Sequence, residues 1–566
     1  MKKLSLCLAA TVGLWSNAQV PASLDSVFAP VKVAVQPSDS YIGLSVMPDG
    51  EIRHYNYGEQ AEPGVFYISS RDKGLTWKNV KYAKDMPEAD TRSPKSGEYL
   101  RLVNMGGKGV YCIRTNGGTE GGRTVTKVSD IGSIMLKPPV FVGGGNRVVV
   151  AAHGGVSPKG CYTYVSDDDG LTWQRSNTVI TPEHRGGGHH KGIRWNHGAV
   201  EPTVVELRDG RLWMLMRTPQ DVHYQAFSED GGKTWSKPEP SRFYGTITMP
   251  TIGRLSDGRL IFFWCNTTPL PELASANGVW DDVFTNRDVT HVAISEDDGK
   301  TWRGFRELRL NPRRNDSNYA TYGRGIDRGM HQAQFVEVDS GKILAAIGQH
   351  RNHRAMVMFD VDWLYETSRY TDFSDSLSSW STFNYIKGIK GHCSYNRING
   401  VTLTAHPDKP GRQVMNVRYE PADTLVSDLR GAVWNFPAMK KGAITSSVKI
   451  PKGSRGVKMV LNDRWFNPSD SVATYECMYT LDLSRSALGI KDDKWHSVEI
   501  EWDVERGGNT AAVVKVDGSK KKRVKLPLRR ATTDGISYVH FIAFPDEEYE
   551  SNPGITVESV YARERD

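Results

Sequence analysis

The sequence predicts an all-β protein built from short strands and tight turns. Three observations support this prediction: one eight-residue motif occurs four times, apolar runs are paired across short turns, and the chain contains 55 Gly, 15 Trp and 23 Tyr. This composition is typical of folded proteins with many short strands and turns. At 566 residues the chain is too long for one ordinary core, so at least two domains are expected.

The first 18 residues have the features of an export signal. A charged start at Met1-Lys2-Lys3 precedes a mostly apolar run over residues 4–15, and Ser16-Asn17-Ala18 supplies small residues for cleavage. We therefore expect a signal peptide over residues 1–18 and a periplasmic or extracellular protein. No later stretch reaches the roughly 18 apolar residues that a membrane span needs, so none is expected.

Charge and cysteine content exclude several classes of partner and cofactor. The formal charge of +7 is spread along the chain, and the basic run at residues 520–523 lies between two strand-like stretches. We interpret that run as a solvated hairpin tip, so no nucleic-acid partner is expected. Five cysteines remain after signal removal, an odd number with no CxxC or Cys/His metal pattern. We expect neither a metal nor another cofactor, no disulfide scaffold, and a monomer.

The repeated motif has the form Ser-x-Asp-x-Gly-x-Thr-Trp. In such a motif the Asp side chain can accept backbone N–H bonds within its own loop, the Gly supplies a positive φ, and the Trp folds back beneath the turn. The motif is therefore predicted to be structural, and its aspartates are not catalytic candidates. The four copies are Ser70–Trp77, Ser166–Trp173, Ser228–Trp235 and Ser295–Trp302.

These repeats resemble the Asp boxes, or BNR repeats, of the sialidase superfamily, and the resemblance implies a β-propeller. Five apolar hairpins, which would be the inner hairpins of the blades, accompany the boxes. Successive boxes start 96, 62 and 67 residues apart, so the first gap is long enough for an extra blade around residues 92–128. We therefore predict a six-bladed propeller over residues 19–369.

From about residue 370 the boxes stop and longer alternating strands begin, such as GAITSSVKI and WHSVEIEWDV. This region, residues 370–566, resembles a concanavalin/laminin-G-like β-sandwich of the jelly-roll type. Such modules often bind glycans, but a purely packing role against the propeller is an equally open alternative.

A propeller brings the residues that flank its inner hairpins to a central well. These flanking positions are more polar than strand turns require. They are Tyr55, Glu59, Arg92, Lys95, His153, His197, Glu201, Arg217, Asn266, His331 and His350.

The run EPTVVELRDGRLWMLMR from Glu201 to Arg217 resembles a sialidase stretch in which a Glu opens one strand and an Arg closes the next. The resemblance implies that Glu201 polarises a tyrosine nucleophile and that Arg217 is one of three arginines binding a substrate carboxylate. Arg287 lies where the family carries its third arginine. A planar guanidinium binds a carboxylate through two parallel hydrogen bonds, and a Glu beside it stays ionised.

Three departures from the family pattern affect the remaining roles. The family's first arginine is missing from residues 39–44, and Arg92 or Lys95 is the candidate substitute. Where a catalytic aspartate is expected, the chain has Glu59, with Glu62 nearby. The sixth blade opens with His331 instead of the nucleophilic tyrosine.

Two mechanisms therefore stay open. In one, Tyr322 reaches in from its glycine-flanked loop and forms a covalent intermediate. In the other, His331 or His197 acts as general acid or base in hydrolysis or in a lyase-type elimination. His197 is also a candidate substrate contact.

The first hypothesis for function is an exported, exo-acting, sialidase-like glycoside hydrolase that removes a terminal acidic sugar from a glycan. The second is a histidine-based propeller glycosidase or polysaccharide lyase that acts on another sugar. The third is a non-catalytic glycan-binding protein, since a fold does not fix a function.

Overall fold

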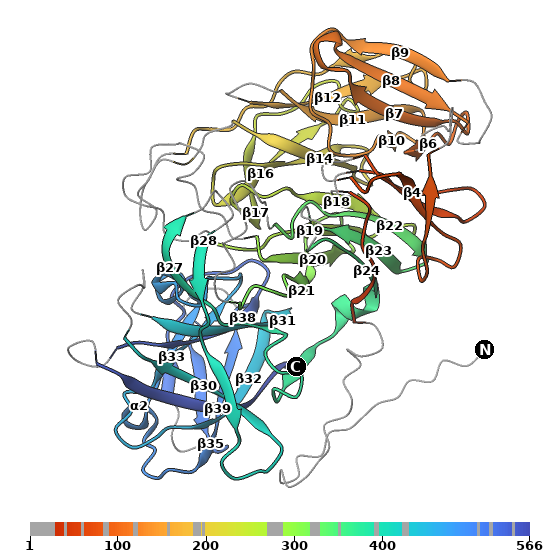
Figure 1. The fold of residues 1–566 in the computed structure, drawn as a ribbon. Coiled ribbons are helices and arrows are strands. Elements are labelled where there is room, and N and C mark those ends of the chain that lie inside the picture. The colour runs from red at the N-terminus through yellow and green to blue at the C-terminus, as the bar shows by residue number, and fades with distance from the viewer. Residues whose placement is uncertain are drawn as a thin grey trace, which may run out of the picture.

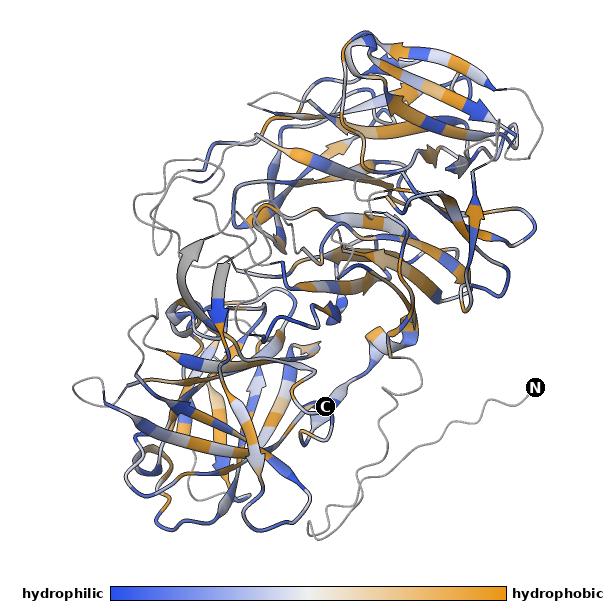
Figure 2. Ribbon diagram, viewed as in Figure 1, coloured by the Kyte–Doolittle hydropathy of each residue, from blue (hydrophilic) through white to orange (hydrophobic). Residues whose placement is uncertain are grey.

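A computed structural model describes residues 29–38, 42–57, 61–82, 90–116, 123–154, 159–184, 194, 198–268, 287–316, 329–348, 353–389, 395–421, 429–505, 510–519, 524–545 and 550–566. The chain forms two β-rich parts (Figure 1), and in both of them hydrophobic stretches run through the strands (Figure 2). No helix in these ranges is both long and apolar enough to cross a membrane.

The N-terminal part contains six four-stranded antiparallel sheets, here numbered along the chain. Sheet 1 is β2 (Leu44–Val46), β3 (Ile52–Tyr55), β4 (Val65–Ser70) and β5 (Lys78–Lys81). Sheet 2 is β6 (Thr91–Arg92), β7 (Tyr99–Asn104), β8 (Val110–Thr115) and β9 (Thr124–Ser129), with a 3₁₀ turn at Gly106–Lys108. Sheet 3 is β10 (Val140–Val142), β11 (Arg147–His153), β12 (Cys161–Ser166) and β13 (Gln174–Arg175).

Sheet 4 is β14 (Val200–Glu206), β15 (Leu212–Arg217), β16 (Val222–Ser228) and β17 (Glu239–Tyr244). Sheet 5 is β18 (Thr251–Arg254), β19 (Leu260–Trp264), β20 (Val289–Ser295) and β21 (Arg303–Leu310). Sheet 6 is β22 (Gln334–Asp339), β23 (Lys342–Ile347) and β24 (Ala355–Asp360), completed by β1 (Val31–Ala34) from the N-terminal side.

The six sheets pack on one another in a closed ring. Each consecutive pair shares a cluster of buried apolar side chains, for example Val149 of sheet 3 with Met214 of sheet 4. Sheet 6 packs on sheet 1 in the same way, through Leu344 and Ile52. The sheet that the box spacing predicts around residues 92–128 is sheet 2. The predicted all-β propeller is confirmed, and β1 joins the last sheet to the start of the chain.

Each Asp box forms a turn, as the motif predicts, and the turn joins the third and fourth strands of its sheet. In the box at Ser228–Trp235, Asp230 Oδ1 accepts the backbone N–H groups of Lys233 and Thr234, both at 2.9 Å, and the Ser228 hydroxyl at 2.8 Å. Gly232 has a φ of +92°, and Trp235 is 6% exposed. The carboxylates of the four box aspartates thus form hydrogen bonds within their own turns.

The C-terminal part is a two-sheet sandwich. One sheet consists of β29 (Thr402–Ala405), β30 (Gln413–Tyr419), β39 (Asn552–Glu564), β32 (Lys441–Lys449), β35 (Trp495–Asp503), β36 (Ala512–Val516) and β37 (Val524–Leu526), with β25 (Ser368–Thr371) paired to β39. The other consists of β26 (Trp380–Ser381), β31 (Arg430–Met439), β38 (Ile536–Ala543), β33 (Val457–Asn462) and β34 (Tyr479–Leu483).

Buried side chains from both sheets form one core, with Trp434 and Phe541 on one sheet facing Ile444 and Ile500 on the other. Short helical turns lie at η4 (Val361–Tyr365), η5 (Ser471–Thr474) and α2 (Arg485–Leu488). A separate hairpin, β27 (Asn384–Ile389) with β28 (Tyr395–Ile398), lies between the propeller and the sandwich (Figure 1).

Candidate functional site

Glu201 and Arg217 lie side by side at one end of the inner hairpin of sheet 4. Arg217 Nη1 donates to Glu201 Oε2 at 2.8 Å, and the two side chains are only 7% and 12% exposed, respectively. The pairing of β14 with β15 is irregular between Val200 and Thr203, and Glu201 itself has a φ of +49°. Such a left-handed conformation is costly for a residue other than glycine. The irregular strand opening therefore sets the direction in which the Glu201 carboxylate points.

The surroundings of Glu201 keep it ionised. Burial raises the pKa of this carboxyl, but the charge and hydrogen bond of Arg217, together with nearby His331, more than offset this and hold its pKa at about 2. Its backbone N–H faces His153 Nδ1 at 3.2 Å, and burial lowers the pKa of His153 to about 4. At neutral pH the site thus holds a carboxylate and a neutral imidazole side by side.

Arg287 and His331 form a second buried pair. Arg287 Nη1 lies 2.9 Å from His331 Nε2, and Arg287 Nη2 donates to the Ile247 carbonyl at 2.7 Å. The Met249 N–H lies 3.2 Å from His331 Nδ1. A neutral imidazole has one ring nitrogen free to accept, so His331 accepts only one of these two donors at a time. Both ring nitrogens of His331 thus face an N–H group of the protein.

Three residues other than glycine have a left-handed backbone close to these two pairs. Glu201, Ile247 and Gln332 are buried or nearly buried, and their φ angles are +49°, +49° and +65°. They precede or open the innermost strands of sheets 4, 5 and 6. A left-handed backbone at a residue other than glycine is maintained where the surrounding packing and hydrogen bonds fix it. Such residues cluster at functional sites.

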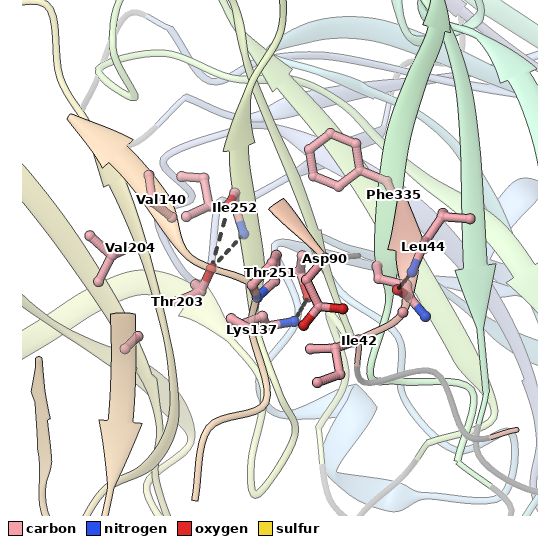
Figure 3. A pocket seen from close by; sticks show the side chains of 14 residues that line it. Ile42, Leu44, Asp90, Lys137, Val140, Thr203, Val204, Thr251, Ile252 and Phe335 are labelled. Atoms are coloured by element: carbon pink, nitrogen blue, oxygen red, sulfur yellow. Dashed lines mark hydrogen bonds between the residues drawn. The ribbon is translucent and has the colours of Figure 1, made fainter. Parts of the chain in front are cut away.

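A cavity lies between the innermost strands of the propeller sheets, and none of the four residues of these two pairs lines it. Its lining comes mainly from the innermost strands, including Thr203, two residues after Glu201, and Gln334, three residues after His331. Figure 3 shows Lys137, Thr251 and Asp90 grouped in this cavity. Lys137 Nζ donates to Thr251 Oγ1 at 2.5 Å and to the Ala333 carbonyl at 3.1 Å, and burial lowers the pKa of this amine to about 7.

The comparison with protein families agrees with this architecture. Residues 125–395, which contain Glu201, Arg217, Arg287 and His331, match the family model described as a BNR repeat-like domain. We use that description as the name of this segment. The resemblance predicted from the Asp boxes is thereby confirmed. No match was found among proteins of curated function.

Solved structures resemble the chain only distantly. A protein of unknown function from Dyadobacter fermentans is 19% identical, with 58% of this chain and 99% of that chain covered and a TM-score of 0.35. Trypanosoma rangeli sialidase in complex with sialic acid is 13% identical, with coverages of 95% and 96% and a TM-score of 0.31. The Hadza microbial sialidase Hz136 is 15% identical, with coverages of 59% and 69% and a TM-score of 0.40. We assign no residue role from these similarities.

The BNR repeat-like domain brings four of the eight sequence-predicted site residues together: Glu201, Arg217, Arg287 and His331. Arg92 is exposed, and its Nε donates to the Gly97 carbonyl of its own turn at 3.2 Å. The other three predicted residues, Glu59, Tyr322 and His197, lie outside the described residues.

Sequence reasoning did not single out two features of the BNR repeat-like domain. One is Lys137, whose only local signal is a lysine placed directly before Pro138 and the apolar strand β10. The other is the segment that leads into β18, where the Ile247 carbonyl and the Met249 N–H contact Arg287 and His331. Backbone groups carry no side-chain signature, so no sequence pattern could have indicated the second feature.

Proposed function

We propose that the chain is an exported, exo-acting glycoside hydrolase that removes a terminal sugar bearing a carboxylate. The observation that carries this proposal is the arrangement of Arg217 and Arg287, each held by a buried partner, beside an ionised Glu201. Guanidinium groups bind carboxylates through directed, charge-assisted hydrogen bonds. Two of them in one buried site suit an anionic substrate group.

Glu201 would serve this reaction as a carboxylate. With a pKa of about 2 it cannot supply a proton at neutral pH, so its role is to accept a proton or to stabilise positive charge. In the hydrolysis that we propose, Glu201 withdraws the proton of the attacking group, which is Tyr322 in a covalent route or water in a direct one. A separate acid, for which Glu59 is the candidate, protonates the leaving oxygen.

A second candidate function is favoured by the position of His331. It touches Arg287, so a substrate carboxylate held there would bring its neighbouring carbon near the imidazole, whose Nε2 would exchange its contact with Arg287 for the substrate proton. Abstraction of a proton at that carbon, with loss of the oxygen substituent on the next carbon, is a lyase reaction and leaves a double bond. A glycan-binding protein without catalysis is the third possibility.

The test is a screen of aryl glycosides of neutral and acidic sugars, and of uronic-acid polysaccharides, against the wild type and Glu201→Gln. The proposal predicts release of the aryl group from acidic sugars and its loss in Glu201→Gln. New ultraviolet absorbance without water consumption would instead identify a lyase. Saturable binding with no product would identify a binding protein, and turnover unaffected by Glu201→Gln would refute the role of Glu201.

A further inference from the structure

Sheet 5 of the propeller is joined to the sandwich by backbone pairing. The Thr268 N–H donates to the Trp465 carbonyl at 2.9 Å, and the Trp465 N–H donates to the Asn266 carbonyl at 2.9 Å. Asn266 Nδ2 also donates to the Asp463 carbonyl at 2.9 Å. The chain just after β19 therefore continues into contact with the chain just after β33.

A buried side-chain relay makes a second connection between the same two parts. His291 Nε2 of β20 lies 2.5 Å from Tyr538 Oη of β38, and Tyr538 donates to Glu307 Oε1 of β21 at 2.8 Å. Burial raises the pKa of both Tyr538 and Glu307, so the phenol keeps its proton. Strand β20, which begins two residues after Arg287, is thus held against the sandwich.

The third connection comes from the β27–β28 hairpin and reaches the candidate site. Arg397 Nη2 of β28 pairs with Asp288 Oδ2 at 3.1 Å, and Arg397 Nη1 donates to the Arg314 carbonyl at 2.6 Å. The guanidinium also lies over the Phe383 ring, 4.0 Å from its centroid. The side chains of Arg397 and Asp288 are 1% and 6% exposed. A buried guanidinium held at three points is a rigid support.

Asp288 is the residue directly after Arg287, and the backbone carbonyls of both residues accept hydrogen bonds from other segments. The Met330 N–H donates to the Arg287 carbonyl at 2.7 Å, and the Asn311 N–H donates to the Asp288 carbonyl at 2.7 Å. Movement of Asp288 would therefore move the Arg287 backbone and the segment that carries His331.

We propose that Arg397, on the hairpin outside the propeller, is a positioning residue for the substrate-binding Arg287. By fixing Asp288 it fixes the origin of the Arg287 side chain, so the hairpin between the two parts completes the carboxylate site of the propeller. This inference rests on the proposed function in one respect only: it takes Arg287 to be the group that binds the carboxylate. Positioning errors of about 1 Å are enough to weaken such a site by large factors.

The test compares Arg397→Gln and Arg397→Lys with wild type and with Arg242→Gln. Arg242 also forms an ion pair between propeller and sandwich, with Asp534 at 3.0 Å, but contacts neither Asp288 nor Arg287 in the described residues. We expect Arg397→Gln to raise KM for an acidic substrate about tenfold while kcat changes less than about threefold. Arg397→Lys, which keeps the charge, should recover part of the loss, and Arg242→Gln should match wild type.

A second readout does not depend on catalysis. Hydrogen exchange of the Met330 amide, whose acceptor is the Arg287 carbonyl, should be faster in Arg397→Gln than in Arg242→Gln. If the wild type turns over no acidic sugar, the proposed function fails, and this exchange difference alone decides whether Arg397 positions Arg287. Unchanged KM and unchanged Met330 exchange in Arg397→Gln, or equal effects in Arg242→Gln, would overturn the inference.

Discussion

Replacing Arg217 by Met should lower the free energy of unfolding, and the size of this decrease should depend on pH. The substitution leaves Glu201 buried without its partner, and breaking a buried ion pair in this way costs roughly 3–5 kcal/mol. The pKa of Glu201 gives a similar figure: a fall from 4.5 to about 2 corresponds to about 3.5 kcal/mol at about 1.4 kcal/mol per pKa unit. At pH 7 the melting temperature should fall by about 5 °C or more.

The sign of the pH dependence follows from the depressed pKa. The stabilisation is present above pH 4.5, the pKa of the unfolded carboxyl, and is lost as pH falls toward about 2. Thermal melts of wild type and Arg217→Met at several pH values between 7 and 3 should therefore converge in acid. A destabilisation that is the same at pH 7 and pH 3, or that is absent at pH 7, would contradict this prediction.

Arg306 offers a matched control for Arg217. It pairs with Glu366 at 2.9 Å, with side-chain exposures of 1% and 11%, and it lies in β21 and not at the inner hairpin of sheet 4. Arg306→Met should lower the melting temperature comparably but leave kcat and KM unchanged. Arg217→Met should also reduce binding of the acidic substrate.

Three further predictions concern other parts of the site and fold. The wild type should become more stable as pH rises from 7 to 10, because burial in the folded protein disfavours the charged Lys137 amine and lowers its pKa to about 7. Lys137→Met should remove this gain in stability, which thermal melts at pH 7.5 and 9.5 would measure. Parallel pH profiles of the two proteins would contradict the prediction. Asp230→Ala should destabilise by roughly 2 kcal/mol, measured by urea unfolding, with kcat unchanged, because its bonds lie within the box turn. Steady-state kinetics should show mainly a higher KM for Arg287→Gln, and, if the reaction is the lyase elimination, a kcat lower by about 10²- to 10⁴-fold for His331→Gln. Identical effects of the two changes would contradict separate roles for Arg287 and His331.

The sequence predicts the fold well where the determinants are local. Each Asp box carries its own turn chemistry, so the hairpins around Asp230 and its counterparts are set by eight consecutive residues. The closure of the ring by β1 is not predictable in this way, because Val31 pairs with Met358, far along the chain. A strand of only four residues carries no sequence pattern that would indicate a partner so far away along the chain.

The candidate site is predicted only in part for the same reason. Glu201 and Arg217 flank one hairpin, and the strand register brings them together. The left-handed φ of Ile247 and the contact of Arg397 with Asp288 depend on the packing of separate sheets. Neither follows from residue type or spacing.

The most direct test of the site is a crystal structure of the protein soaked with a free sugar acid such as sialic acid. We expect the carboxylate of the bound sugar within hydrogen-bonding distance of the guanidinium groups of Arg217 and Arg287, and Glu201 facing its anomeric carbon. A sugar bound only on the sandwich or on the outer strands, or a carboxylate that touches neither arginine, would contradict it.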